Sequence, residues 1–315
     1  MTMLAALPKG RTERVIFFGT PEIAVGPLRA LVEAGFVVDL VVTGVDKRRG
    51  RGSQTSPSPV KEAAIEMQLA VTHDVADAIA LVNKNRAKNS IDTNSYLGVV
   101  VAYGHIISKD ALQVLPMINI HYSLLPRWRG AAPVERALLA GDEQTGVCIM
   151  QVVEQLDAGD ILSSATTQIS QTDTTATLRS RLGEMANPLL IDVLTHGVSD
   201  TKPQIGDIVV AAKITQVDLE IDWSKPAVVV DRQVRVGGAF TFFNDKRFKI
   251  HSLKVSAEIF ISKSGNMVVV DDRVLVACGQ GVVELVEVQP EGKPRISAHD
   301  WKKGARLDAQ SRLGS

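Results

Sequence analysis

VIFFGTPEIAVGPLRALVEAGFVVDLVVT, at residues 15–43, is the stretch of this chain that decides its class of fold. It opens with a short apolar run that ends in Gly19, Thr20 and Pro21, which is typical of a buried strand followed by a turn. Apolar residues with helical spacing follow over residues 23–34, and a second apolar run occupies residues 37–43. A strand, a helix and a strand within about 30 residues form a βαβ unit, whose two strands are parallel.

The same alternation of apolar runs and helical spacing continues toward residue 120. It predicts a doubly wound, Rossmann-like α/β domain, in which ligands lie beyond the carboxyl ends of the strands. Further on, residues 177–194 predict one long helix, in which Pro188 predicts a kink or a break. The other expected elements are helices over 61–68 and 77–86, a helix from 111, and strands from 70, over 97–102, over 118–120 and over 146–150.

The character of the chain changes near His196. Residues 197–207 are rich in Ser, Thr, Pro and Gly, as linkers often are, and the apolar runs beyond them are short and separated by turn signals. Closely spaced short strands predict a small, OB-like β-barrel or a sandwich. We therefore expect a first domain over residues 1–196, a linker over 197–208 and a second domain over 209–315. The expected strands of the second domain lie at 227–230, 240–243, 248–250, 267–270, 274–277 and 282–288.

The composition is that of a folded protein with more than one domain. The chain has 315 residues, more than the roughly 100–200 of a typical domain. Lys plus Arg and Asp plus Glu both number 35, so any basic surface that binds nucleic acid must be local. Cys148 and Cys278 lie far apart in apolar contexts, which predicts two buried thiols in a reducing compartment rather than a zinc site.

The apolar runs and the N-terminal residues indicate where in the cell the protein is found. No run reaches the ~20 apolar residues that a membrane-spanning helix needs. The first residues, MTMLAALPKGRTER, place charge after a short apolar run, whereas a signal peptide places it before a longer one. We expect a cytoplasmic protein with a frayed N-terminus.

Asn119 and His121 are the first candidates for chemistry. Both stand at the end of an expected strand, where the alternation of side chains places them on one face. An Asn amide can donate to a developing oxyanion, and an imidazole can donate or shuttle a proton. Asp157 follows in an expected loop, and a carboxylate beside an imidazole fixes the orientation of the ring. Asn119, His121 and Asp157 are therefore the predicted catalytic residues of an acyl-transfer site.

Two further segments add polar and basic residues. SLLP at residues 123–126 is followed by RWRGAAP at 127–133, a stiff, positively charged loop. After the second expected strand comes DKRRGRGS at 46–53, whose basic residues and glycines predict a mobile cationic loop at the rim of the sheet. On their own, such segments are also typical of solvated surface loops.

Together these motifs closely resemble the methionyl-tRNA formyltransferase family. The resemblance extends over nearly the whole chain, including the linker and the second domain. The Asn-x-His and Leu-Asp-x-Gly motifs are shared by the wider group of enzymes that use 10-formyltetrahydrofolate, so they indicate the chemistry and leave the acceptor open. The motifs, in the family's order and spacing, are FGTP at 18–21, VVAYG at 100–104, NIH at 119–121, SLLPRWRGAAP at 123–133 and LDAGD at 156–160.

The resemblance implies an enzyme of translation initiation. Asn119, His121 and Asp157 match the family's catalytic positions, where the formyl group of 10-formyltetrahydrofolate passes to the α-amine of methionine on initiator methionyl-tRNA. No metal is needed, and we expect a monomer. The first domain is the expected folate-binding catalytic domain. The residues expected against the folate are Val100, Ala102, Tyr103, Gly104, Ser123, Leu124, Leu125 and Pro126.

The resemblance also implies contacts with tRNA. In this family the loop that matches residues 46–53 enters the acceptor stem, and Arg51 occupies the position of its key arginine. The family's second domain is OB-like and grips the tRNA as well. The residues expected to bind tRNA are Lys47, Arg48, Arg49, Arg51, Arg127 and Arg129.

Other functions stay open at this point. Another formyltransferase of the same group, acting on an amine of a nucleotide sugar or of the purine pathway, would keep the catalytic residues but would not need the basic loop or the OB-like domain. A folate hydrolase could use the same residues. A non-catalytic dinucleotide-binding module would need the G-x-G-x-x-G fingerprint, which the turn at residues 19–22 lacks. A purely structural tRNA-binding protein would have no need for the catalytic set.

Overall fold

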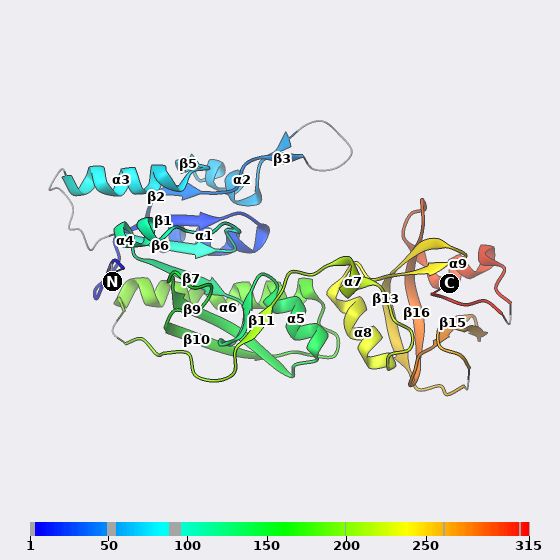
Figure 1. Ribbon diagram of the computed structural model, residues 1–315. Helices are drawn as coiled ribbons and strands as arrows, with labels where there is room; N and C mark the ends of the chain where they lie inside the picture. Colours follow the sequence, from blue (N-terminus) through cyan, green and yellow to red (C-terminus); the bar gives the residue numbers. More distant parts are fainter. Residues whose placement is uncertain are drawn as a thin grey trace. The chain divides into compact units, whose positions relative to one another are not determined.

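The chain folds into two compact units. The computed structural model describes residues 4–48, 55–87, 96–198, 200–260, 262–308 and 310–314, and Figure 1 shows their helices and strands. The first unit comprises Met1–Pro133, Gln144–Gln168 and Arg179–Ala211, and the second comprises Val134–Glu143, Ile169–Leu178 and Ala212–Ser315. The predicted residue bounds of the catalytic domain, the linker and the tRNA-binding domain stay predictions.

A seven-stranded sheet forms the centre of the first unit, in the order β10-β9-β7-β6-β1-β2-β5 (Figure 1). From β5 to β7 neighbouring strands are parallel, whereas β9 runs antiparallel to β7 and β10 antiparallel to β9. The strands are β1 (Arg14–Gly19), β2 (Val37–Val42), β5 (Val71–Thr72), β6 (Tyr96–Val101), β7 (Met117–His121), β9 (Gln144–Gln151) and β10 (Ile161–Gln168).

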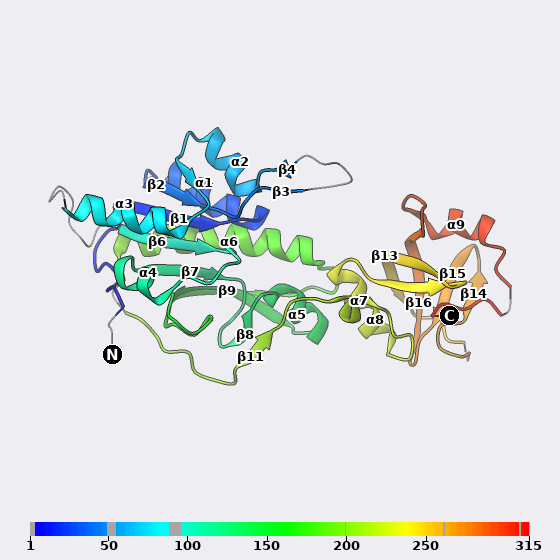
Figure 2. The same cartoon turned by 45° about the horizontal axis from the view of Figure 1, so that its top comes forward.

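Helices cover both faces of this sheet, as Figure 2 shows. Ile16 and Phe18 of β1 pack with Ala78 and Val82 of α3 on one face. The other residues of β1 point to the opposite face because side chains alternate along a strand. The predicted doubly wound α/β fold is confirmed. The helices of the first unit are η1 (Glu22–Ala24), α1 (Val25–Glu33), α2 (Pro59–Glu66), α3 (Val75–Ala87), α4 (Lys109–Val114) and most of α6 (Thr175–His196), whereas α5 (Pro133–Ala140) belongs mainly to the second unit.

The long helix α6 differs from its prediction in one respect. It runs from Thr175 to His196 without interruption, so the break considered at Pro188 does not occur. Leu182, Ala186 and Leu190 of this helix are all fully buried. Their packing stabilises the turns on both sides of the proline, which offsets the one backbone hydrogen bond that a proline cannot make.

Short strand pairs tie the loops of the first unit together. β3 (Lys47–Arg48) pairs with β4 (Thr55–Ser56) at the base of the basic loop. β8 (Arg127–Gly130) pairs in parallel with β11 (Val209–Ala211), so the residues just after the expected linker form a strand of the first unit. Near the N-terminus, the backbone N–H of Ala5 donates to the carbonyl of Leu112. The expected frayed end is therefore wrong from this residue onward.

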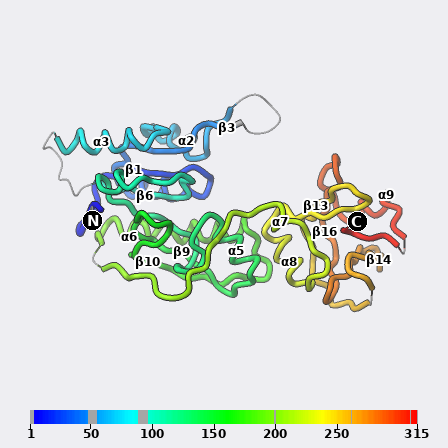
Figure 3. The backbone as a smooth tube through the Cα atoms, viewed as in Figure 1, coloured from blue at the N-terminus to red at the C-terminus, as the bar shows by residue number. Residues whose placement is uncertain are grey.

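The second unit is an antiparallel half-barrel, as the OB-like prediction requires. Figure 3 traces its backbone through a sheet of order β12-β13-β16-β15-β14, with β17 paired to β16. Trp223, Phe248 and Trp301 lie in its apolar core. The elements are α7 (Gln216–Leu219), α8 (Ala227–Val236), β12 (Phe240–Phe243), β13 (Lys246–Ser256), β14 (Met267–Val270), β15 (Arg273–Ala277), β16 (Val282–Pro290), β17 (Ile296–Ser297) and α9 (Ala298–Ala305).

One predicted strand of the second unit is a helix. Residues 227–230 read Ala-Val-Val-Val, and a run of β-branched residues favours a strand. In the structure they begin α8, in which Ala227, Val230 and Val234 are buried. These three residues recur at helical spacing, and the amphipathic packing of that stripe against the half-barrel overrides the local β propensity.

Two smaller predictions concern the cysteines and membrane-spanning helices. Cys148 and Cys278 are free and buried, as predicted. Burial raises the pKa of the Cys278 thiol to about 11, so this thiol stays protonated and unreactive at neutral pH. In the part of the chain that the structure describes, no helix combines the length and apolar character needed to span a membrane.

Candidate active site

The strand β7 places Asn119 and His121 at the carboxyl edge of the sheet. β7 is the last parallel strand in the order, and its final residues pair with β9, where Asn119 is opposite Met150 and His121 opposite Cys148. Both candidates point to the same side because one residue separates them along the strand. This is the edge where doubly wound sheets hold their ligands.

Asp157 lies on the same side, close to both residues. Its Oδ1 accepts a long hydrogen bond of 3.5 Å from the Asn119 amide, and its Oδ2 lies 3.6 Å from His121 Nδ1. The backbone N–H of Gly130 donates to Oδ2 at 2.8 Å. The structure thus brings together the three residues that the sequence singled out, although they lie far apart along the chain.

His121 stands between two acceptors. Its Nε2 lies 2.8 Å from the carbonyl oxygen of Trp128, and its Nδ1 faces the carboxylate of Asp157. A carbonyl can only accept, so Nε2 carries a hydrogen in this arrangement. A substrate oxygen that takes a hydrogen bond from this nitrogen must therefore displace the Trp128 carbonyl.

The site is largely screened from water. The His121 side chain is 6 % exposed and that of Asp157 is 11 % exposed. In such a setting the interaction between a charge and a dipole is stronger than in water. The arrangement is suited to stabilising charge on a small group, such as the oxygen of an acyl carbon under attack.

A tight turn follows His121 and closes the site on one side. The Ser123 hydroxyl donates to the carbonyl of Arg127 at 2.7 Å, and Ser123 is fully buried. Tyr122 is buried as well, and its hydroxyl donates to the carbonyl of Ile23 at 3.4 Å. Burial raises the pKa of the Tyr122 phenol well above its usual value, so it acts as a neutral donor.

The residues expected to bind folate divide by exposure. Ala102 and Gly104 are exposed, and both have positive φ, 46° and 81°, in the turn after β6. Their neighbour Tyr103 is buried and packs edge-on against Phe18 at 5.7 Å. Val100, Ser123, Leu125 and Pro126 are buried, and Leu124 is half-buried. At this rim Ala102 and Gly104 are therefore exposed and Leu124 is partly exposed, whereas the other five residues are buried.

The residues expected to bind tRNA lie in different surroundings. Lys47 is exposed in β3, beside Arg48, whereas Arg49 and Arg51 fall outside the described residues. At the base of this loop, Lys61 Nζ forms an ion pair of 2.9 Å with Asp46.

Two more expected cations lie on β8. The Arg127 guanidinium is exposed and lies 4.5 Å from the ring centroid of Trp128. Arg129 is half-buried and donates from Nε and Nη2 to Gln204 Oε1, at 2.9 and 2.7 Å.

The sequence interpretation missed the main-chain partners of the site and Gln204. Trp128 contributes a carbonyl and Gly130 an N–H, and neither contribution depends on the side chain. Gln204 lies in the segment expected to be a linker, yet its Nε2 donates to the carbonyls of Asp157 and Gly159. A Gln in a segment rich in Pro and Gly gives no sequence signal for such a contact.

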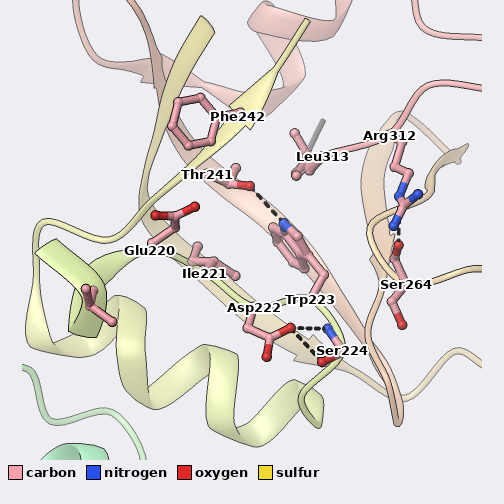
Figure 4. Close-up of a pocket in the computed structure, with 12 residues that line it drawn as sticks. Glu220, Ile221, Asp222, Trp223, Ser224, Thr241, Phe242, Ser264, Arg312 and Leu313 are labelled. Atoms are coloured by element: carbon pink, nitrogen blue, oxygen red, sulfur yellow. Dashed lines mark hydrogen bonds between the residues drawn. The ribbon is translucent and has the colours of Figure 1, made fainter. Parts of the chain in front are cut away.

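A cavity of about 480 Å³ in the second unit is a separate feature (Figure 4). Two pairs of its polar side chains are joined by hydrogen bonds: Trp223 Nε1 donates to Thr241 Oγ1 at 3.0 Å, and the Ser224 hydroxyl donates to Asp222. Leu313 and Gly314 form part of its wall. None of the predicted site residues lines this cavity, so it is distinct from the site around Asp157.

Comparison with known proteins identifies the class. Residues 13–194 match the Formyl transferase family, and residues 213–306 match the family described as Formyl transferase, C-terminal domain. The fold is thus that of a formyl transferase.

Curated relatives give the family within this class. The methionyl-tRNA formyltransferase of Corynebacterium diphtheriae is 39 % identical over 310 residues, 92 % of this chain and 96 % of that protein. The protein of the same name from Jannaschia sp. is 39 % identical over 302 residues, 93 % of this chain and 97 % of that protein. The chain therefore belongs to the methionyl-tRNA formyltransferase family.

Solved structures share the fold at low sequence identity. An N-formyltransferase from Helicobacter canadensis, in complex with folinic acid and dTDP-3-aminofucose, has a TM-score of 0.63 at 16 % identity, over 89 % of this chain and 99 % of that one. HypX from Aquifex aeolicus, in complex with tetrahydrofolic acid, has a TM-score of 0.62 at 15 % identity, over 96 % of this chain and 48 % of that one.

Proposed function

We propose that the protein transfers the formyl group of 10-formyltetrahydrofolate to the α-amine of methionine on initiator methionyl-tRNA, acting as a cytoplasmic monomer in translation initiation. The observation that carries this proposal is the group of Asn119, His121 and Asp157 at the carboxyl edge of the sheet, in a chain of this family. An amide and an imidazole that both lie beside one carboxylate suit acyl transfer to an amine.

The reaction follows from the chemistry of an amine and a formamide. The amine nitrogen of methionine attacks the formyl carbon, and a C–N bond forms while the formyl oxygen gains negative charge. The Asn119 amide donates to that oxygen, and His121 adds a second donor once its N–H exchanges the Trp128 carbonyl for the substrate. One well-placed donor of this kind is worth about 3 kcal/mol in the transition state.

Proton movement completes the reaction. The bond between the formyl carbon and the N10 atom of the folate breaks, and N10 takes up a proton. The attacking amine loses one proton, so no net charge is created. Asp157 accepts that proton through a water molecule and passes it on to N10, and it orients His121 because its carboxylate faces the ring. The products are formylmethionyl-tRNA and tetrahydrofolate.

The folate is proposed to lie beside this site, along the turn after β6 and the turn after β7. Ala102 and Gly104 present exposed main chain there, which supports hydrogen bonding to a flat heteroaromatic ring. The half-buried side chain of Leu124 supports an apolar contact with the same ring. Pockets for such ligands combine apolar walls with a few polar main-chain groups.

The tRNA is proposed to contact the basic loop, β8 and the second unit. Lys47 and Arg127 are exposed, and Arg48, Arg49 and Arg51 extend the same run of charge in the sequence. In the second unit Lys213, Lys246, Lys249 and Lys254 are exposed, and no ion pair joins them to another described residue. Phosphate contacts of this kind make affinity fall steeply with salt concentration.

The proposal is tested by incubating the protein with 10-formyltetrahydrofolate and methionine-charged initiator tRNA. The expected result is N-formylmethionine, detected by mass spectrometry after the aminoacyl ester is hydrolysed. Parallel reactions contain uncharged tRNA, an amino-sugar nucleotide, or no acceptor. Formylation of the small amine without formylation of the tRNA overturns the proposed acceptor, and release of formate in every reaction points to a hydrolase.

A further inference from the structure

We propose that Gln204 is a positioning residue that holds the loop of Asp157 in its active arrangement, and that Arg129 orients Gln204 rather than contacting tRNA. This inference rests on the proposed role of Asp157 in formyl transfer. On this proposal, the segment that the sequence predicts to be a linker contributes to catalysis.

Gln204 makes hydrogen bonds from both ends of its amide. Its Nε2 donates to the carbonyl of Asp157 at 2.9 Å and to the carbonyl of Gly159 at 2.8 Å. Its Oε1 accepts from Arg129 Nε at 2.9 Å and from Nη2 at 2.7 Å. A guanidinium can only donate, so it fixes which end of the amide faces the two carbonyls.

The loop that Gln204 holds has a strained backbone at its functional residue. Asp157 has φ of +49°, in the left-handed region that a non-glycine residue adopts only when its surroundings impose it. At Gly159 an added Cβ would lie 1.9 Å from the carbonyl oxygen of Gln151, so the chain runs directly against β9. The two hydrogen bonds from Gln204 fall on the carbonyls of these two loop residues.

Two neighbouring residues of β8 hold Asp157, one directly at its carboxylate and the other through Gln204 at its main-chain carbonyl. Gly130 of β8 donates its N–H to the carboxylate, and Arg129, the preceding residue, acts through Gln204 on the carbonyl of the same aspartate. Hydrogen bonds therefore hold both the side-chain carboxylate and the main-chain carbonyl of Asp157 in place. Together they fix the orientation of the carboxylate that faces His121.

The chain around Gln204 is fixed to the same structure on both sides. Lys202 and Ile161 exchange two backbone hydrogen bonds, at 2.8 and 2.9 Å, and Thr201 Oγ1 donates to Asp160 at 3.0 Å. After Gln204, β11 pairs with β8. The segment from Thr201 to Ala211 is therefore bound along the site, which is the condition for one of its side chains to position a catalytic group.

The first test is the kinetic effect of Gln204→Leu. Leucine has a similar size but lacks both amide groups, so the carbonyls of Asp157 and Gly159 lose their donor. We expect kcat to fall by about 10- to 100-fold, since small misplacements of a catalytic group have effects of this size. The KM values for the folate and for the tRNA are expected to stay within about twofold, because Gln204 touches neither substrate in the proposed arrangement.

Gln233→Leu is the matched control. Gln233 Nε2 also donates to two carbonyls two residues apart, those of Asp218 and Glu220, at 2.7 and 2.8 Å, but these residues belong to the second unit, whereas Asp157 belongs to the first. The same loss of two hydrogen bonds is expected to lower thermal stability while kcat stays near that of the wild type. An equal loss of kcat in both variants would show a general effect of destabilisation and overturn the proposal.

Gln204→Glu tests the same point if Gln204→Leu does not fold. The carboxylate keeps the length of the side chain and gains a charge-assisted contact with Arg129, which supports folding, but it cannot donate to the two carbonyls. We expect kcat to fall at unchanged thermal stability. A folded Gln204→Glu protein with wild-type kcat overturns the proposal.

The role of Arg129 is tested by a double-mutant cycle. If Arg129 acts through Gln204, then Arg129→Leu and Gln204→Leu each lower kcat, and the double variant is little worse than either one. Independent, multiplicative losses, or a rise in the KM for tRNA alone in Arg129→Leu, overturn this part. The measurements follow whichever amine the wild type formylates, so a wrong acceptor refutes the proposed function without affecting the comparison of variants.

Discussion

Two aspartate-bearing loops, one in each unit, both involve a close approach between a glycine and a carbonyl, but their carboxylates have different partners. In the first unit Asp157 is followed by Gly159, which is pressed against the carbonyl of Gln151. In the second unit Asp222 lies beside Ser224, whose carbonyl oxygen would be 1.8 Å from a Cβ added at Gly279. Both loops thus depend on a glycine that allows the main chain to approach a carbonyl closely.

The carboxylates of the two loops differ in what they contact. Asp222 accepts from the N–H and the hydroxyl of Ser224, two residues along the chain, and these bonds hold the pKa of its carboxyl below the usual value. Asp157 instead accepts from Gly130 and faces Asn119 and His121, which all lie far away in sequence. The carboxylate of Asp222 thus accepts within its own turn, whereas that of Asp157 lies beside Asn119 and His121, the residues with which it is proposed to act.

The largest expected effect is that of removing a partner of Asp157. Asn119→Ala is predicted to lower kcat by about 10²- to 10³-fold, because the amide is the proposed donor to the formyl oxygen. Asn266→Ala, which removes an amide that donates to Ser262 in the second unit, is the matched control and should keep kcat within about twofold. Steady-state formylation at saturating substrates gives both values. Wild-type kcat in folded Asn119→Ala contradicts the assignment.

A smaller effect is expected from the two glycines. Gly159→Ala and Gly279→Ala each force a Cβ against a carbonyl, and each is predicted to lower the free energy of unfolding by about 1–3 kcal/mol. Only Gly159→Ala should also lower kcat, by about tenfold, because the shift moves Asp157. Chemical denaturation and kinetics on the same preparations check this. The comparison of the two loops fails if Gly279→Ala loses as much kcat as Gly159→Ala.

The smallest effect concerns a structural carboxylate of the second unit. The hydrogen bond from Arg136 lowers the pKa of Asp218 to about 2. A carboxyl whose pKa is depressed in the folded state stabilises the protein above its unfolded pKa of about 3.9, and this stabilisation is lost as the pH falls through about 2. Asp218→Asn is therefore predicted to lower stability at pH 5 by about 1 kcal/mol or less, with a smaller difference near pH 2.

Denaturant titrations of the wild type and Asp218→Asn across this pH range measure that difference. The kcat of Asp218→Asn at neutral pH should remain that of the wild type, since Asp218 belongs to the second unit and is not one of the proposed catalytic residues. A difference in stability that grows toward low pH would be inconsistent with the depressed pKa.

The sequence revealed the central sheet because its parallel strands are buried on both faces. β1, β2 and β6 are almost continuously apolar, so each run marks a strand without help from tertiary contacts. β10 was missed, since its sequence ILSSATTQ is largely polar and it lies at the end of the strand order. An edge strand has fewer buried positions, and the apolar signal weakens accordingly.

The sequence predicted the side chains of the candidate site but not its main-chain groups. Asn119, His121 and Asp157 have residue types that suit the chemistry, and their motifs match a family. The Trp128 carbonyl and the Gly130 N–H could not be predicted, because every residue has such groups and only the fold selects them. Gln204 was missed for a related reason: it acts on main-chain carbonyls, which impose no pattern on the sequence around it.

The central claim is that the carboxylate of Asp157 takes part in the formyl transfer. Asp157→Asn is the sharpest change, because an amide of the same shape can still accept from the Gly130 N–H while losing the charge beside His121. The measurement is the single-turnover rate of formylation of charged initiator tRNA, with thermal unfolding as the check on folding. A fall of about 10²-fold or more in a folded protein is the predicted result. A rate equal to that of the wild type would contradict the account.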